Sequence, residues 1–235
     1  MIIALVTVGV ISIAALALRL VTASGAVSGL LLGLSIWHGA GGAAFGLLGA
    51  FFVLGSGATK LGYRVKEARG AAQARKGART IFNVLANGLV AGLLALACRY
   101  HPFPWAMAAL VTSLAAATAD TLESEIGTLG RRPPRLITTF KEVPPGTDGG
   151  VSPLGTAAGL LGASVIGCLG WALGLIEAGG LGVVVGAAFA ATVMESVLGA
   201  LFKTRSHTAG HVLNVFTTLS APLLVLAWGA FRGTP

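Results

Sequence analysis

The chain has 235 residues, of which 55% are hydrophobic and only 10% are charged, with a formal net charge of +8. This composition excludes a water-soluble globular core and indicates an integral membrane protein. In such a protein a basic excess sets orientation and contacts anionic lipid headgroups, so we expect no nucleic-acid partner.

Eight apolar runs follow one another along the chain. They cover residues 2–18, 24–37, 39–58, 80–98, 104–121, 155–176, 180–201 and 210–231. The second run is shorter than the roughly 20 residues that cross a bilayer, so it is either a tilted crossing or a re-entrant segment. The sequence therefore predicts an all-α, polytopic integral membrane bundle of about seven to eight spans, forming a single domain over residues 1–235.

Glycines four residues apart occur in two of the runs. They are Gly25, Gly29 and Gly33 in the second run, and Gly155 and Gly159 in the sixth. This spacing lets two helices approach closely, so we interpret all five as packing positions.

The basic residues alternate between successive gaps in the apolar pattern. Fourteen of the 16 Lys and Arg residues occupy every second gap, including Lys203 and Arg205, and only Arg99 and Arg232 occupy the others. Because positively charged loops stay in the cytoplasm, the basic loops at about 59–80 and 127–154 are predicted to be cytoplasmic and both termini external. We expect a protein of the bacterial inner membrane whose site faces the cytoplasm.

Polar side chains within the runs gather near their predicted cytoplasmic ends. A carboxylate as deep as Glu195 must pair with a cation, bind a metal or become protonated. Asp120 and Glu123 share a helical face at a spacing of three, whereas Glu125 points elsewhere. Carboxylates beside a basic loop suit Mg²⁺ carrying phosphates, although acids at a solvated helix end and asparagines that join helices are the simpler alternatives. The polar residues of this level are Asn83, Asn87, Asp120, Glu123, Glu125, Glu195 and Asn214.

The segment between residues 135 and 156 is rich in Gly, Pro, Ser and Thr around Lys141. Gly146, Gly149 and Gly150 allow the backbone to turn its N–H groups towards an anion, and Lys141 adds a positive charge. A phosphate cradle and an ordinary surface loop are both compatible with this composition. Residues 55–60 do not form the phosphate-binding loop of the Walker type, because the sequence lacks its Gly-Lys-Ser/Thr ending.

Four motifs resemble one membrane family: GSGATKLGYRVK (55–66), NVLANG (83–88), ATADTLESEIG (117–127) and ITTFKEVPPGTDGGVSPLGT (137–156). That family contains plant phytyl-phosphate kinase and animal transmembrane protein nineteen. The resemblance covers nearly the whole chain and implies phosphate transfer from a nucleoside triphosphate, expected to be CTP, to a prenyl monophosphate. The chain departs from the family pattern at Glu195, where we expect Asp, and at Asn83, where we expect Gln. The functional residues that the resemblance carries over are Lys60, Asn87, Asp120, Glu125, Lys141, Gly146, Thr147, Gly149, Gly150, Ser152 and Asn214.

The resulting hypothesis is a prenyl-phosphate kinase that takes CTP or ATP and a prenyl monophosphate as substrates, among membrane lipids, with no prediction of oligomeric state. Asp120 and Glu195, with help from Glu125, hold Mg²⁺. Lys141 and the loop 146–150 bind the triphosphate, and Lys60 or Arg79 binds the acceptor phosphate. Little covalent chemistry is required, because phosphoryl transfer depends mainly on alignment and charge neutralisation.

A transporter or lipid flippase that uses Glu195 as an ion site is the main alternative, and a non-catalytic membrane partner is the third. An alternating-access site places polar groups near the bilayer midplane and towards both faces. In this sequence they gather on one side, which favours the kinase.

Overall fold

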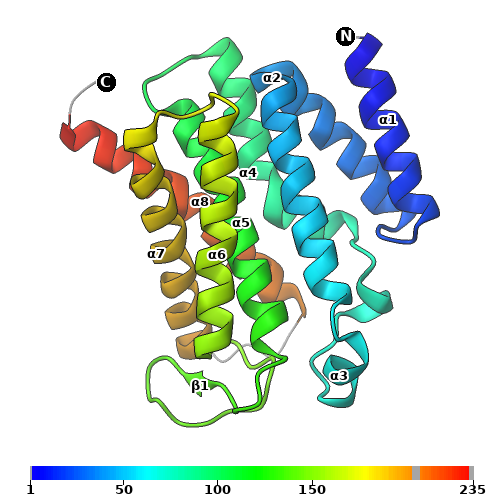
Figure 1. Cartoon of the computed structure of the whole chain (residues 1–235), viewed down its shortest axis with the longest axis vertical. Helices are drawn as coiled ribbons and strands as arrows, with labels where there is room; N and C mark the ends of the chain where they lie inside the picture. The colour runs from blue at the N-terminus through cyan, green and yellow to red at the C-terminus, as the bar shows by residue number, and fades with distance from the viewer. Residues whose placement is uncertain (1, 203–206, 233–235) are drawn as a thin grey trace.

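The computed structural model describes residues 2–202 and 207–232, and it is helical nearly throughout (Figure 1). A short 3-10 turn covers Ala74–Gly77, and a two-residue antiparallel hairpin pairs β1 (Arg135–Leu136) with β2 (Gly150–Val151). The α-helices of the described ranges are α1 Ile2–Ala17, α2 Ala23–Lys60, α3 Tyr63–Ala68, α4 Ile81–Tyr100, α5 Ala106–Gly127, α6 Pro153–Ala172, α7 Ala178–Phe202 and α8 His207–Arg232.

Each predicted apolar run corresponds to a helix or to half of one. Within the described residues, α2, α4, α6, α7 and the Gly210–Arg232 part of α8 are long and apolar enough to cross a membrane, and α1 is a shorter apolar helix. The prediction of a polytopic helical membrane bundle is confirmed.

Helix α2 folds back on itself at Gly41, whose φ of 87° and ψ of 176° are not helical. Trp37 before the bend packs on Phe45 after it, with ring centroids 5.3 Å apart. The first half therefore runs alongside the second in the opposite direction (Figure 1).

The short run 24–37 lies in this first half, and the residues that flank it contact the two ends of α4. At its start the N–H of Thr22 donates to the carbonyl of Arg79, just before α4 (3.0 Å). At its end the ring Nε2 of His38 lies 2.6 Å from the hydroxyl of Tyr100, the last residue of α4. These two contacts at opposite ends of α4 favour the tilted crossing over the re-entrant segment.

Helix α5 lies at the centre, in contact with α2, α4, α6, α7 and α8. Its residues 106 and 108–119 are buried and consist largely of Ala, Thr and Ser with a few larger aliphatic side chains. Small residues suit a helix that meets protein on all sides, because they let neighbouring backbones approach. Helix α5 is not among the helices that are apolar enough to span a membrane by hydropathy, because its C-terminal part carries Asp120, Glu123 and Glu125.

The glycine packing prediction is confirmed at four of its five positions. A side chain on Gly155 or Gly159 of α6 would press against the backbone of α5, at 2.8 Å and 3.1 Å. Gly25 meets the Arg79 carbonyl and Gly33 meets the side chain of Val8. The prediction is wrong for Gly29, which has open space where a side chain would begin.

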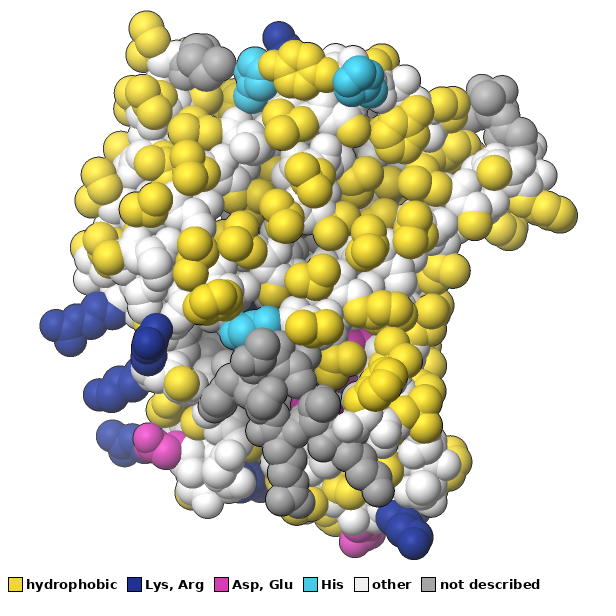
Figure 2. Space-filling model, turned by 180° about the vertical axis from the view of Figure 1, so that it is seen from behind, with side chains coloured by type: hydrophobic (Ala, Val, Ile, Leu, Met, Phe, Trp, Pro, Cys, Tyr) yellow, Lys and Arg dark blue, Asp and Glu magenta, His cyan; other side chains and the backbone are white. Residues whose placement is uncertain are grey.

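The basic residues are concentrated at one end of the bundle. On the face of the molecule seen in Figure 2, most Lys and Arg side chains lie towards the lower end, and one lies at the opposite end. Helix α1 begins and α8 ends at the end opposite the β1 and α3 loops (Figure 1). This arrangement fits the alternation seen in the sequence, although Lys203 and Arg205 lie outside the described residues.

Candidate functional site at the basic end of the bundle

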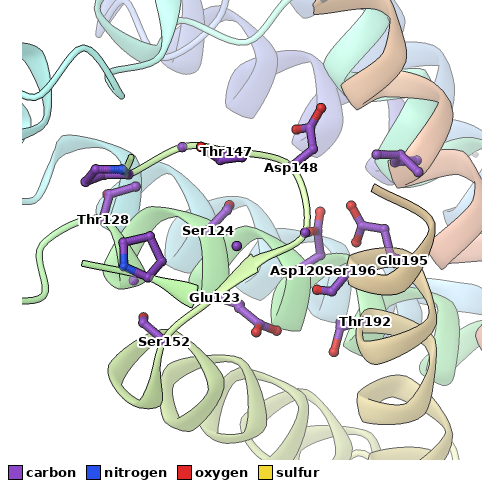
Figure 3. A pocket seen from close by; sticks show the side chains of 17 residues that line it. Asp120, Glu123, Ser124, Thr128, Thr147, Asp148, Ser152, Thr192, Glu195 and Ser196 are labelled. Atoms are coloured by element: carbon purple, nitrogen blue, oxygen red, sulfur yellow. The ribbon is translucent and has the colours of Figure 1, made fainter. Parts of the chain in front are cut away.

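A cavity of about 140 Å³ lies where the C-terminal part of α5 meets α7, the start of α6 and the loop 134–150 (Figure 3). The loop arches over the cavity, and α7 closes the other side. Several predicted site residues line it together: Asp120, Glu195, Gly146, Thr147, Gly149, Gly150 and Ser152.

Asp120 of α5 and Glu195 of α7 form the centre of this site. Their carboxyl groups lie within hydrogen-bonding reach of each other, although the residues are 75 positions apart in the sequence. The hydroxyl of Thr217 on α8 donates to Glu195 Oε2 at 2.9 Å and orients that side chain. Two carboxyl groups so close together share a proton or a cation, since two adjacent negative charges repel strongly.

Two further acids, Glu123 and Asp148, line the cavity, and neither was among the predicted site residues. Glu123 accepts a hydrogen bond from the Thr156 hydroxyl of α6 (3.3 Å), and Thr192 of α7 lines the same cavity. The sequence feature that could have identified Glu123 as a site residue was its three-residue spacing from Asp120. Asp148 lies in the loop, and partial burial raises the pKa of its carboxyl above the ordinary value.

The donor set of this cavity fits a hard cation. All its charged lining groups are carboxylates, and several hydroxyls surround them. Across residues 2–202 and 207–232 no three Asp, Glu, His or Cys side chains form a complete metal-binding group. That is compatible with Mg²⁺, which keeps several waters and binds through one or two carboxylates plus substrate phosphates.

The glycine loop is fixed by its contact with α7. Gly146 and Gly149 have φ values of +80° and +75°, a region that side chains disfavour. A side chain on Gly149 would lie 2.5 Å from the Ser196 carbonyl and from the Ala200 amide nitrogen. The glycine therefore lets the loop dock directly on α7 and places Asp148 beside Glu195 (Figure 3).

The predicted anion cradle needs one correction. The N–H of Gly150 donates to the Thr147 carbonyl (2.9 Å), and the N–H of Thr147 donates to Pro144 (3.2 Å). These two groups close turns within the loop and do not point at a ligand. Ser152 also has a structural task, since its hydroxyl accepts the Gly155 N–H (3.1 Å) and caps α6 before Pro153.

Glu125, predicted as a metal ligand, lies away from the cavity. One carboxylate oxygen accepts a hydrogen bond from Thr59 (3.1 Å), and the other pairs with Lys66 Nζ at 2.5 Å. The Lys66 side chain is fully buried and also donates to the Ala58 carbonyl, near the end of α2. Both oxygens of Glu125 are thus used to fasten α2 and α3 to α5, and the prediction that it completes the Asp120 metal site is not supported.

The two predicted lysines also lie outside the cavity. Lys141 is exposed at the tip of the loop, where its carbonyl accepts the Leu136 N–H (2.9 Å). Lys60 is exposed at the end of α2. Neither side chain is among the groups that line the acidic cavity, so their predicted phosphate contacts are not formed in this arrangement.

Arg79, in contrast, reaches into the bundle. Its guanidinium lies 5.2 Å from the centre of the Phe51 ring and against Gly55, where a side chain would collide with it. Burial lowers the pKa of Arg79, while the negative charges of Glu125 and Asp120 raise it. An arginine keeps its proton in such surroundings, so it is a permanent cation near the acidic pair.

Of the three predicted asparagines, two connect helices and one caps its own helix. Asn83 accepts the N–H and hydroxyl of Thr80 and thereby caps α4. Asn87 donates to the Asn83 carbonyl (2.9 Å) within α4 and accepts from Asn214 of α8 (3.3 Å). The contact between Asn87 and Asn214 is the joining role that was the alternative for such residues, and none of the three lines the acidic cavity.

Comparison with known proteins places the sequence among membrane proteins. The family described as integral membrane protein DUF92 matches residues 6–221. The uncharacterized membrane proteins sll0875 of Synechocystis and MJ0933 of Methanocaldococcus jannaschii are 39% and 37% identical over 74% of this chain, covering 69% and 71% of their own lengths. Protein VTE6, chloroplastic, of Arabidopsis thaliana is 37% identical over 78% of this chain and 57% of its own length. No solved structure matches.

Proposed function

Because the chain belongs to the integral membrane protein family DUF92, we propose that it is a prenyl-phosphate kinase. It transfers the terminal phosphate of CTP or ATP to a prenyl monophosphate and yields the diphosphate. One observation carries the proposal: an acidic pair from two helices, Asp120 and Glu195, faces a glycine-bearing loop at the basic end of the bundle. The motif resemblance to the family that contains plant phytyl-phosphate kinase supports the choice of substrate.

Asp120 and Glu195 would hold Mg²⁺, which neutralises phosphate charge as the transferred group leaves the nucleotide. Glu123, held by the Thr156 hydroxyl, lines the same cavity and would support the metal ligands from their outer side. Helix α6 begins at the edge of the cavity, and the partial positive charge of its N-terminus favours a phosphate there.

In the transfer step an oxygen of the prenyl monophosphate attacks the terminal phosphorus of the nucleotide. The bond from that phosphorus to the bridging oxygen breaks, and the nucleoside diphosphate leaves with the electron pair. The acceptor is already an anion, so the chain supplies position and positive charge, with Arg79 on the acceptor side.

The core of the bundle favours an enzyme over the transporter alternative. Between the cavity and the opposite end, Leu110 and Leu114 of α5 are fully buried in an apolar core that also contains Ile166 of α6 and Val184 of α7. A site closed on one side suits a reaction between a lipid and a nucleotide that enter from the same face. We place that face in the cytoplasm, since it carries the basic loops.

The direct test is incubation of purified protein with Mg²⁺, CTP or ATP, and farnesyl, geranylgeranyl or phytyl monophosphate. We expect a prenyl diphosphate, and we expect Asp120→Asn to lower its rate of formation by about 100-fold or more, the scale seen when a group that stabilises transition-state charge is lost. Glu67→Gln, an exposed acid on α3, is the control and keeps the wild-type rate. Failure of every substrate pair, or full activity of Asp120→Asn, would disprove the proposal.

A further inference from the structure

A second hollow, of about 110 Å³, lies between α1, the two halves of α2 and the start of α4. Its wall is almost wholly apolar and includes Val8, Ile11, Leu32, Phe45, Phe52 and Val84. We refer to it as the α1–α2 groove.

Two glycines create this groove. Gly29 and Gly49, from opposite halves of α2, both line it, and both have open space where a side chain would begin. The neighbouring Gly25 and Gly33 touch the Arg79 carbonyl and Val8, respectively. In the glycine series of α2, Gly25 and Gly33 therefore allow close contacts with neighbouring segments. Gly29, between them, leaves volume unfilled in the groove.

The groove is polar at the end formed by Arg79 and Asn83. Arg79 lines the groove, and its guanidinium lies over the ring of Phe51, another lining residue, within electrostatic reach of Asp120 in the acidic site. A narrow apolar hollow that ends at a single permanent cation is complementary to a hydrocarbon chain with one anionic headgroup. Arg79 is the residue that joins this hollow to the acidic pair.

We propose, on the basis of the proposed function, that the α1–α2 groove holds the hydrocarbon chain of the prenyl monophosphate, with its phosphate at Arg79. The acceptor phosphate then approaches Asp120 from the α2 side of α5, while the nucleotide occupies the loop side. Gly29 and Gly49 set how much of the chain is enclosed.

Filling the groove tests this assignment by kinetics. Gly49→Leu and Gly29→Leu place a side chain in the open space, and Gly186→Leu makes the same change at an open, exposed position of α7. We expect the two groove variants to raise the KM for geranylgeranyl monophosphate about tenfold, the effect of exposing one or two methylene groups. In these two variants the KM for the nucleotide stays at the wild-type value. In Gly186→Leu the KM for geranylgeranyl monophosphate and the KM for the nucleotide both stay at the wild-type value. Equal effects of all three substitutions would contradict the assignment.

A binding measurement separates the groove from the reaction. A geranylgeranyl monophosphate with a diazirine on its last isoprene unit is irradiated with wild-type protein in nanodiscs, and the labelled peptides are mapped. We expect labels on α1 and α2 that excess geranylgeranyl monophosphate removes and excess phosphatidylglycerol does not.

The other outcomes of the labelling experiment separate the groove assignment from the kinase proposal. Labels confined to α6 and α7 would overturn the groove and leave the kinase proposal intact. Equal competition by phosphatidylglycerol would identify the groove as a site for bilayer lipid and overturn the assignment. Specific labelling of α1 and α2 without any diphosphate formation would support the groove and defeat the proposed function.

Discussion

Glu123 and Glu125 are separated by one residue on α5 and have different surroundings. Glu123 lines the acidic cavity, where the Thr156 hydroxyl of α6 donates to it. Glu125 is almost fully buried against Lys66. Two residues along a helix correspond to roughly 200° of rotation, so adjacent acids of one motif point to opposite sides.

We expect Lys66→Met to destabilise the protein by about 3–5 kcal/mol, because removing one partner of a buried ion pair leaves the other charge uncompensated. Thermal or SDS-induced unfolding in detergent measures the change. The double variant Lys66→Met with Glu125→Leu removes both charges, so it recovers most of the loss. A double variant as unstable as the single one would show that the pair is not the cause.

Glu123→Gln is expected to leave the stability close to wild type and to raise the Mg²⁺ requirement of transfer about 10- to 100-fold, the range for groups that support metal ligands. Titration of activity with Mg²⁺ measures this. Glu142→Gln is the control, since Glu142 is exposed in the same loop region and pairs only with exposed Arg135. An unchanged Mg²⁺ requirement in Glu123→Gln would remove Glu123 from the site.

At the scale of elements, the contact between the loop 146–150 and α7 brings the two parts of the site together. A side chain on Gly149 would collide with the backbone of α7 near Ser196. Conversely, a side chain on Gly199 of α7 would lie 3.0 Å from the amide nitrogen of Gly149. A glycine faces a glycine, so the backbones can touch. This contact decides where Asp148 lies relative to Glu195.

Gly149→Ala is expected to abolish most transfer activity, since the new methyl group pushes the loop off α7. Gly174→Ala is the matched control: its φ of +70° is equally unfavourable for alanine, but open space surrounds it. Both variants bear a backbone strain of about 1–2 kcal/mol, and only the first also displaces the loop. Comparison of their unfolding temperatures and transfer rates separates strain from displacement. Equal activity in both would argue against the contact.

At the scale of the whole molecule, charge and polarity are distributed unevenly between the two ends. The acidic cavity, the glycine loop and most of the basic side chains described here lie towards one end, and the core beyond them is apolar. The uneven distribution predicts which end faces the cytoplasm.

Cysteine labelling tests this orientation. In a chain with Cys98 and Cys168 replaced by alanine, we expect a membrane-impermeant maleimide to reach Lys141→Cys only from the cytoplasmic side and Glu177→Cys only from the other side. Both positions are exposed, and they lie beyond opposite ends of α6. Labelling of both from the same side would contradict the predicted topology.

The linear pattern of residues was enough to predict the helices and the side on which the polar groups gather. Backbone groups in a bilayer must be hydrogen-bonded within their own segment, so apolar runs become helices whatever their neighbours are. Charge alternation is likewise a property of the linear chain. The pairing of Asp120 with the glycine loop was predictable because the motifs carry the family's pattern.

The partner that each polar residue meets could be read only from the folded arrangement. The sequence does not indicate that Lys66 holds Glu125 away from the acidic cavity, that Arg79 turns inward, or that Lys141 stays in solvent. The break between the runs 24–37 and 39–58 was visible in the sequence, but the open groove that Gly29 faces was not. These outcomes depend on how distant segments pack, because the free energy of a buried charge is set by the groups that surround it and not by its position along a helix.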